Sequence, residues 1–442
     1  NIPIETWRTH FSYNSIRKII PATNSVVCVA TNGMFYINPS DKSFTLLGKN
    51  DGLSDTSPTA LSYDKNTENL VVGFASGLVD IMQNGKVRTC RNIEQSPLIG
   101  SKHINSAVVI GDRVYVGNGF GVVSIDLESA EVIENFKSIG LQGADVPVFE
   151  SISFEGQLVI LTSQTIQIGS LNTNLLDFTN WKVLIASDSA NVVFKSLTVQ
   201  GDHIYAIAND TLIMKSDGGS FEIFQESTDF VHELIGTDQG LFGLTDQSIV
   251  KIDDTSLSTA VLLPANLNPQ TFGYNNGFWV GTNAQGVYTP DNQHVLPNGP
   301  ASDLINSIRF TDNQLFAFYG PHVDDYFDQV DSLGFGLFDN LSWKNIEIPG
   351  FYNLTDAATF SDHTYISSAG FGLYNYTTQN LVSGIEPSYQ TDKIVIPELA
   401  VSQNLYIPCY EHHQPLYLMN QTGELIKYDS SYTITQSPTG VQ

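Results

Sequence analysis

The chain of 442 residues is poor in cysteine, and it has no long apolar run. Its three cysteines, Cys28, Cys90 and Cys409, lie far apart, which excludes a disulfide framework and argues against a zinc site. We interpret Cys28 as a small core hydrophobe. An apolar run of about 18 residues, the length that a membrane-spanning helix needs, is absent, so we expect no such helix. Amphipathic helical spacing is absent as well, and this favours an all-β protein.

Basic residues are also scarce, because 20 Lys and Arg stand against 46 Asp and Glu, for a net charge of −26. This balance argues against a protein that binds nucleic acid, since such binding depends on basic side chains that displace counterions. Eleven of the 20 basic residues lie in residues 1–113, and nine lie in the remaining 329. We therefore expect an anionic ligand to bind, if anywhere, in the first quarter of the chain.

A short hairpin recurs along the sequence, for example at 69–82, 113–125 and 277–288. In each copy an apolar strand ends at a small residue or at the residue that enters a turn. After the turn, a second apolar strand runs back along the first. We use the residue that ends the first of these two strands as the register residue of each unit. The register residues are Ala30, Gly73, Gly117, Leu161, Ile207, Leu244, Gly281, Phe318, Ser367 and Pro408. Ten units, spaced by 37 to 49 residues, fill the chain.

Four short antiparallel strands in every unit of about 40 to 45 residues are typical of β-propeller blades. An array of β-sandwich domains is the alternative, and it would repeat at about 100 residues. Known propellers mostly have about four to eight blades. Ten units can therefore form a ring of seven followed by the start of a second ring, two incomplete rings, or one ring of ten. We predict a first propeller region of about seven blades in residues 1–300 and blades of a second in residues 301–442.

An aromatic residue followed by a cation marks the last strand of some units, in Trp181-Lys182 and Trp343-Lys344. Trp7-Arg8 has the same pattern at the start of the chain. We interpret residues 5–11 as an outer strand that completes a later blade, because propellers remove their open sheet edge in this way.

Two clusters could hold a metal ion. An insertion in unit eight contains His322 with Asp324, Asp325, Asp328 and Asp331, which are enough oxygen donors for calcium. A solvated acidic loop is the alternative. The segment 409–413 holds one thiol and two imidazoles, but without a second ligand pair we do not expect zinc there.

A cationic cluster lies between the hairpin of unit two and the first strand of unit three, namely Lys86, Arg88, Arg91, Lys102 and His103. Arg side chains bind carboxylates and phosphates in a directional, bidentate way, so this cluster is our candidate for anionic ligands. A solvated loop that offsets neighbouring acids is the alternative.

Catalysis is not indicated. No G-x-S-x-G or H-E-x-x-H motif occurs, and the nine histidines are scattered. The glycine-rich segment Gly117–Gly121 lies between two strands, so we interpret it as a tight turn rather than a phosphate loop.

Several segments resemble the amino-terminal propeller region of the PorZ family, which belongs to the type IX secretion system of Bacteroidetes. They are Trp7–Tyr13, Thr31–Tyr36, Asn50–Ser54, Leu70–Gly77, Asn404–Ile407 and Gln414–Leu418 with Gly423. More loosely, the repeats are similar to those of two-component regulator propellers.

The resemblance implies two seven-bladed propellers followed by a sorting domain, and no enzymatic activity. It also implies a place in the cell-surface attachment complex beside the sortase-like PorU and the proteins PorV and PorQ, with anionic lipopolysaccharide as a further ligand. The chain begins with Asn1 rather than Met and ends after about ten units, so we expect a partial or processed chain.

Together, the residues and the resemblance predict a binding scaffold in the periplasm or on the outer cell surface. The alternative function is the glycan-sensing periplasmic propeller of a hybrid two-component regulator.

Overall fold

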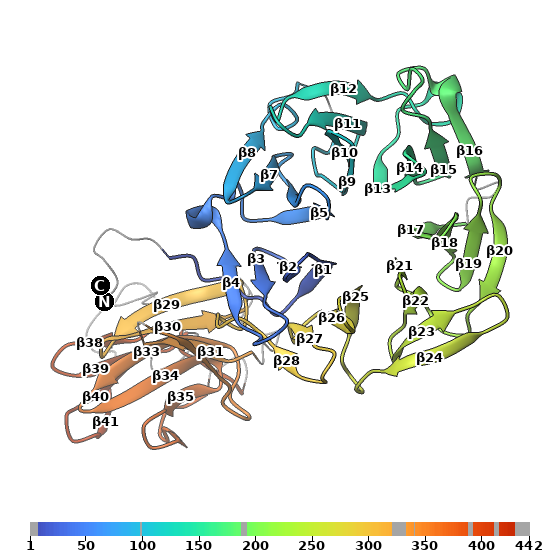
Figure 1. Ribbon diagram of the computed structural model, residues 1–442. Helices are drawn as coiled ribbons and strands as arrows, with labels where there is room; N and C mark the ends of the chain where they lie inside the picture. The colour runs from blue at the N-terminus through green and yellow to red at the C-terminus, as the bar shows by residue number, and fades with distance from the viewer. Residues whose placement is uncertain are drawn as a thin grey trace. The chain divides into compact units, whose positions relative to one another are not determined.

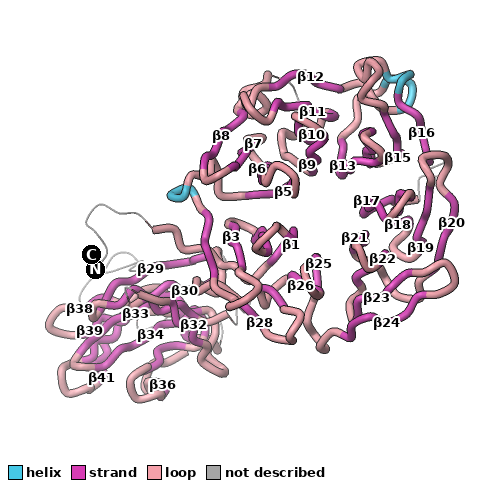
Figure 2. Tube along the Cα trace, viewed as in Figure 1, coloured by secondary structure: helices cyan, strands magenta, loops and turns pink. Residues whose placement is uncertain are grey.

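The computed structural model describes residues 8–97, 100–186, 192–320, 333–339, 341–387, 392–410 and 415–428. These residues form ten antiparallel sheets and three short 3-10 helices (Figure 2). The helices are η1 (Lys49–Asp51), η2 (Leu141–Gly143) and η3 (Phe178–Asn180). The predicted all-β fold of four-stranded propeller blades is confirmed.

The chain forms two compact units. Unit 1 is built from Asn1–Thr9 together with Tyr13–Pro297, and unit 2 from His10–Ser12 together with Asn298–Gln442. Within the described residues, unit 1 holds seven sheets and unit 2 holds three.

Each blade of unit 1 consists of four strands that follow one another along the chain. Blade 1 consists of β1 (Ile16–Pro21), β2 (Val26–Ala30), β3 (Met34–Ile37) and β4 (Phe44–Leu47), and blade 2 of β5 (Pro58–Asp64), β6 (Asn69–Phe74), β7 (Val79–Gln83) and β8 (Lys86–Cys90). Blade 3 consists of β9 (Ser106–Ile110), β10 (Arg113–Asn118), β11 (Gly121–Asp126) and β12 (Val132–Phe136), and blade 4 of β13 (Val148–Phe154), β14 (Gln157–Thr162), β15 (Thr165–Gly169) and β16 (Trp181–Ala186). Blade 5 consists of β17 (Phe194–Gln200), β18 (His203–Ala208), β19 (Leu212–Ser216) and β20 (Glu222–Glu226). Blade 6 consists of β21 (Glu233–Thr237), β22 (Gly240–Leu244), β23 (Ser248–Ile252) and β24 (Leu257–Leu262). Blade 7 consists of β25 (Pro269–Tyr274), β26 (Phe278–Thr282), β27 (Val287–Tyr288) and β28 (His294–Val295).

The seven blades of unit 1 are arranged in a ring (Figure 1). The first strand of each blade faces the centre, and the fourth strand lies outside. Blade 1 closes the ring against blade 7, where Gly286 donates its N–H to the Asn14 carbonyl over 2.8 Å. Lys42 adds an ion pair with Asp291 at 3.3 Å and lies 4.8 Å from the Trp279 ring centre.

Burial follows the position of a strand within its blade. The second and third strands are almost fully buried, as in β2 and β15, because both faces of a blade pack against neighbouring blades. The outer strands β20 and β24 are mostly exposed. This explains why the second and third strands appear in the sequence as continuous apolar runs.

All ten predicted register residues lie in the second strand of a blade. At three of them glycine permits close packing against the first strand of the next blade or the segment that leads into it. A Cβ on Gly73 would lie 2.4 Å from Ile104 Cγ2, and one on Gly281 would lie 2.6 Å from Ile16 Cγ2. A Cβ on Gly117 would lie 2.8 Å from Val148 Cγ1. The repeated glycine is therefore a packing requirement between blades.

The three cysteines are free and buried, and Cys28 is fully inaccessible within β2. This confirms its interpretation as a core hydrophobe. Burial raises the pKa of the Cys28 thiol, and it raises that of Cys409 to about 12.

Unit 2 contains blades 8 to 10, with one extra strand, β37, paired to β34. Blade 8 consists of β29 (Ile305–Thr311), β30 (Gln314–Tyr319), β31 (Phe335–Phe338) and β32 (Trp343–Ile346). Blade 9 consists of β33 (Leu354–Phe360), β34 (His363–Gly370), β35 (Gly372–Asn375) and β36 (Asn380–Leu381), with β37 (Ile394–Val395) as the extra strand. Blade 10 consists of β38 (Ala400–Val401), β39 (Leu405–Pro408), β40 (Leu416–Met419) and β41 (Leu425–Lys427). Trp181 and Trp343 begin fourth strands, as their pattern predicted.

The predicted outer strand at residues 5–11 is wrong for its described part, since residues 8–14 form no strand. Every blade of unit 1 already has four consecutive strands of its own, so none needs a strand from elsewhere. The segment His10–Ser12 instead belongs to unit 2. There His10 Nδ1 accepts a hydrogen bond from Trp343 Nε1 over 3.0 Å, and the Ser12 N–H donates to Asp303 Oδ1 over 2.6 Å.

Candidate functional site

The cationic cluster lies on two elements of unit 1. Lys86 and Arg88 lie on the outer strand β8, and Lys102 and His103 lie in the segment before β9. Lys86 and Arg91 are exposed, whereas Arg88, Lys102 and His103 are partly buried.

Two members of this cluster already bind backbone carbonyls. Arg88 Nη2 donates to the Leu127 carbonyl over 3.1 Å, and Lys102 Nζ donates to the Glu94 carbonyl. The first contact joins β8 to the turn after β11, and the second joins the segment before β9 to the turn after β8. The exposed Lys86 and Arg91 therefore carry most of the charge that this cluster offers to a ligand.

The four aspartates of the unit-eight insertion, Asp324, Asp325, Asp328 and Asp331, lie outside the described residues, and so does His322. Calcium binding there stays a prediction. Across the described residues 8–428, with the gaps given above, no group of three or more His, Cys, Asp or Glu side chains is placed to hold a metal ion. Gly117 and Asn118 end β10 and Gly121 begins β11, so the glycine-rich segment is a strand-to-strand turn as predicted.

Carboxylates on first strands form a network that sequence reasoning missed. Glu150 Oε2 accepts the N–H of Leu197 over 2.6 Å, and Glu233 Oε2 accepts the N–H of Phe272 over 3.0 Å. In each pair the donor lies on the first strand of the following blade. In unit 2, Asp356 Oδ2 accepts the N–H of Leu399, which directly precedes β38, over 2.8 Å. Each carboxylate thus joins its blade to the next.

Lys18 of blade 1 connects to this network, with its Nζ 2.6 Å from Glu233 Oε1. The charge of Glu233, together with Glu150, raises the pKa of Lys18 despite the opposing effect of burial. Burial raises the pKa of Glu150, with Lys18 acting in the opposite direction. Lys18, Glu150 and Glu233, which lie on the first strands of blades 1, 4 and 6, therefore interact electrostatically at the centre of unit 1.

A cavity of about 450 Å³, here called the central cavity, opens beside these charges. Its lining comes from the first strands of blades 1, 5, 6 and 7 and includes Lys18, Glu233, Phe272 and Tyr274. Lys18 and Glu233 are already paired with each other, and the lining also includes the exposed Lys65 and Asp238.

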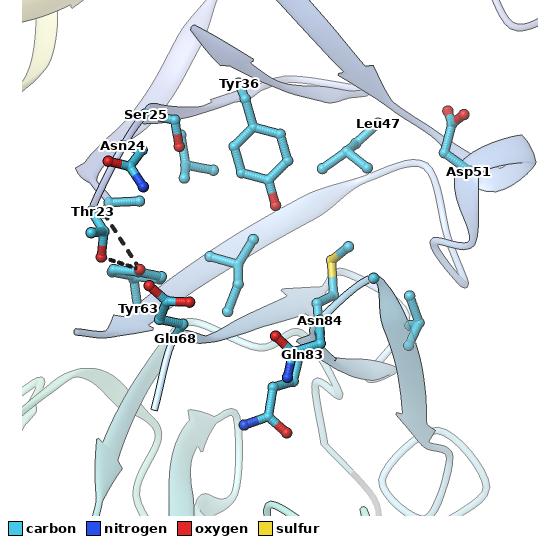
Figure 3. Close-up of a pocket in the computed structure, with 16 residues that line it drawn as sticks. Thr23, Asn24, Ser25, Tyr36, Leu47, Asp51, Tyr63, Glu68, Gln83 and Asn84 are labelled. Atoms are coloured by element: carbon cyan, nitrogen blue, oxygen red, sulfur yellow. Dashed lines mark hydrogen bonds between the residues drawn. The ribbon is translucent and has the colours of Figure 1, made fainter. Parts of the chain in front are cut away.

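A second cavity of about 400 Å³, here called the blade 1–2 cavity, lies between the first two blades (Figure 3). Tyr36 on β3 directs its hydroxyl into the cavity toward blade 2, and Gln83 and Asn84 lie on the opposite side. Tyr63 Oη is 2.7 Å from Thr23 Oγ1, so the two blades are also hydrogen-bonded at the rim.

Sequence reasoning did not find these cavity residues, because they come from strands and turns that are far apart along the chain. A weak signal exists for the carboxylate network. Glu150, Glu233 and Asp356 are acids near the start of first strands, at similar places in three units.

Comparison with known proteins links the first blades to one family. Residues 26–182 match the family model described as the PorZ N-terminal β-propeller domain of the type IX secretion system. No curated protein matches the sequence. Within the described residues, none of the helices is both long and apolar enough to cross a bilayer.

Among solved structures, the chain is similar to PorZ of Porphyromonas gingivalis, which is described as an essential bacterial surface component of the type IX secretion system. The identity is 19% and the TM-score 0.79, over 96% of this chain and 60% of PorZ. The chain thus spans about 60% of the length of that relative.

More distant similarity is found to extracellular domains of two Bacteroides thetaiotaomicron proteins. BT4673, described as a one-component system, is 11% identical with a TM-score of 0.47, over 95% of this chain and 67% of that one. BT3049, described as a hybrid two-component system, is 11% identical with a TM-score of 0.49, over 96% and 60%. The resemblance predicted from the sequence is therefore confirmed, since residues 26–182 match the PorZ N-terminal β-propeller domain and the chain shares the PorZ fold.

Proposed function

We propose that this protein is a non-enzymatic β-propeller scaffold of the type IX secretion attachment complex, exported to the periplasm or the outer cell surface. The observation that carries the proposal is the match of residues 26–182 to the PorZ family, supported by a TM-score of 0.79 over 96% of the chain.

The physical basis of a scaffold role is rigidity. Apolar clusters pack successive blades against each other, for example blades 1 and 2 and blades 4 and 5. The first-strand carboxylates add hydrogen bonds from one blade to the next. Loops on such blades keep fixed spacings, so this chain loses little conformational entropy when a partner binds several of them.

The partners in this proposal are the sortase-like PorU and the proteins PorV and PorQ. The test is a pull-down in which the tagged chain is mixed with solubilised outer membranes of a type IX-secreting bacterium and scored for the sortase-like protein. We expect recovery with this chain and none with an unrelated seven-bladed propeller as bait. Equal recovery with both baits, or with neither, would contradict the proposal.

Anionic lipopolysaccharide is the second ligand in this proposal, with the cationic cluster as its site. Combined Lys86→Glu and Arg91→Glu should weaken its binding about tenfold or more, because the two exposed attractive charges of the cluster become repulsive. The matched control is combined Lys137→Glu and Lys344→Glu, which reverses two basic residues elsewhere. Unchanged binding in the Lys86/Arg91 variant would remove the cluster from the proposal.

A further inference from the structure

The blade 1–2 cavity combines aromatic, amide and hydroxyl groups above an apolar base. Val27, Leu47, Leu70, Met82 and Val87 form the apolar part of its lining. The uncharged polar part is Tyr36, Tyr63, Thr23, Ser25, Asn24, Gln83 and Asn84. Its volume falls within the range of about 300–1,000 Å³ that is usual for small-molecule sites.

Several of the polar groups are held in place without a ligand. Tyr63 Oη accepts the Thr23 N–H over 3.4 Å and also contacts Thr23 Oγ1. Gln83 Nε2 donates to the Thr67 carbonyl over 3.1 Å, which leaves its Oε1 as an acceptor. Asn84 lies in a tight turn with φ of 50°, followed by Gly85 at 73°. A site with fixed polar groups binds with a smaller entropy cost.

The charge of the lining restricts the class of ligand. None of its sixteen residues is Lys, Arg or His, whereas Asp51 and Glu68 are both exposed acids at its edge. An anionic ligand would be repelled. Figure 3 shows Asp51 and Glu68 on opposite sides of the cavity, so they do not converge on one cation.

From this combination we propose that the blade 1–2 cavity binds an uncharged saccharide unit. A sugar ring has apolar C–H faces that pack on an aromatic ring, and hydroxyls that both donate to and accept from amides and tyrosines. The Tyr36 hydroxyl, directed into the cavity, is the central polar contact. Burial, with a contribution from Tyr63, raises the pKa of Tyr36, so this hydroxyl keeps its proton near neutral pH and can donate. The inference does not depend on the proposed function, because it concerns a different site and an uncharged ligand.

The test is saturation-transfer NMR on the full chain with four neutral probes and one anionic probe. The neutral probes are mannotriose, maltotriose, lactose and N,N′-diacetylchitobiose, and the anionic probe is trigalacturonate. We expect at least one neutral probe to bind at concentrations up to about 10 mM, and trigalacturonate not to bind. Absence of binding by all four neutral probes, or equal binding of trigalacturonate, would overturn the proposal.

Substitutions locate the site. Tyr36→Phe keeps the ring but removes the hydroxyl, and Gln83→Leu keeps the bulk but removes the amide. Each should weaken the neutral probe about fivefold or more, the size expected for one lost hydrogen bond. The control Tyr274→Phe makes the same chemical change in the central cavity and should leave binding unchanged. Equal weakening in all three variants, or in none, would place the saccharide elsewhere and refute the assignment.

Discussion

Asp80 shows how a single buried residue determines local structure. Its side chain is fully inaccessible on β7. It accepts hydrogen bonds of 2.7 Å each from the Ser54 N–H, the Ser54 hydroxyl and the Thr89 hydroxyl. Ser54 lies in the linker from blade 1 to blade 2, and Thr89 lies on β8. One carboxylate therefore attaches the linker and the outer strand to the middle of blade 2.

Asp80→Ala should lower the free energy of unfolding by about 3 kcal/mol, because it leaves buried donors without an acceptor. Thermal unfolding followed by calorimetry measures this loss. Asp112→Ala, at an exposed acid of the same unit, is the control and should change stability by less than about 0.5 kcal/mol. Equal effects of the two substitutions would contradict this role of Asp80.

Glu150 makes stability depend on pH. Its pKa is raised above the usual 4.5 in the folded protein, mainly by burial, so the folded state binds this proton more tightly than the unfolded state. The contribution of Glu150 to stability is therefore greatest below about pH 4.5 and is lost as the pH rises through the folded-state pKa. Glu150→Gln cannot ionise, so we expect it to reduce the fall in melting temperature as the pH rises from about 4.5 toward neutrality.

Melting temperatures between about pH 4 and 8 test this expectation. The control Glu155→Gln removes an exposed carboxyl from the same blade and should keep the pH profile of the original protein. A Glu150→Gln profile parallel to that of the original protein would show that Glu150 does not cause this dependence.

Among the elements, the second strand of each blade sets how closely the next blade can approach. Gly73→Ala places a methyl group 2.4 Å from Ile104 Cγ2 and should cost about 1–3 kcal/mol of stability through overpacking. A double variant with Ile104→Ala relieves part of the clash, so its loss should be smaller than the sum of the two single losses. Additive losses, measured by calorimetry, would show that the two residues do not compete for the same space.

Strand pattern was predictable from the sequence because it depends on neighbours along the chain. Positions such as Gly73 and Leu161 repeat with the apolar runs that every blade needs, and Trp181 and Trp343 mark the fourth strands. The outer strand predicted near Trp7 was wrong in its described part, because the same aromatic-cation pattern occurs without a sheet to join.

The sites were harder to predict because they depend on contacts between distant segments. Lys18 and Glu233 meet across 215 residues, and no local pattern records such a pair. Tyr36 and Gln83 are separated by 47 positions and line one cavity only because blades 1 and 2 are adjacent in the ring. In the predicted cationic cluster, likewise, the sequence could not show that Arg88 and Lys102 already bind backbone carbonyls.

At the scale of the whole molecule, the first strand of unit 2 differs from those of unit 1. Ile308 and Phe310 on β29 are 61% and 64% exposed, whereas Ile16 and Ile19 on β1 are at most 3% exposed. Exposed apolar side chains on one blade face favour association with another surface.

Combined Ile308→Lys and Phe310→Lys should therefore reduce self-association at high protein concentration, with little change in melting temperature. Light scattering coupled to gel filtration measures this. The control Ile223→Lys changes a residue of similar exposure, 63%, on the outer strand β20 and should have no effect. Unaltered self-association in the double variant would show that β29 takes no part in it.

The segment His10–Ser12 has a consequence for the order of folding. Ser12 binds Asp303 across 291 residues, and closing so long a loop in an unfolded chain is entropically costly. Once the ring of unit 1 has closed, the hydrogen bond between Asn14 and Gly286 holds these two residues together. The chain that must then be closed into a loop is only the two residues from Ser12 to Asn14 and the 17 residues from Gly286 to Asp303. This reduces the closure cost by about 2 kcal/mol. The segment His10–Ser12, although it precedes the ring in the sequence, is thus expected to reach its final position only after the seven-bladed ring has formed.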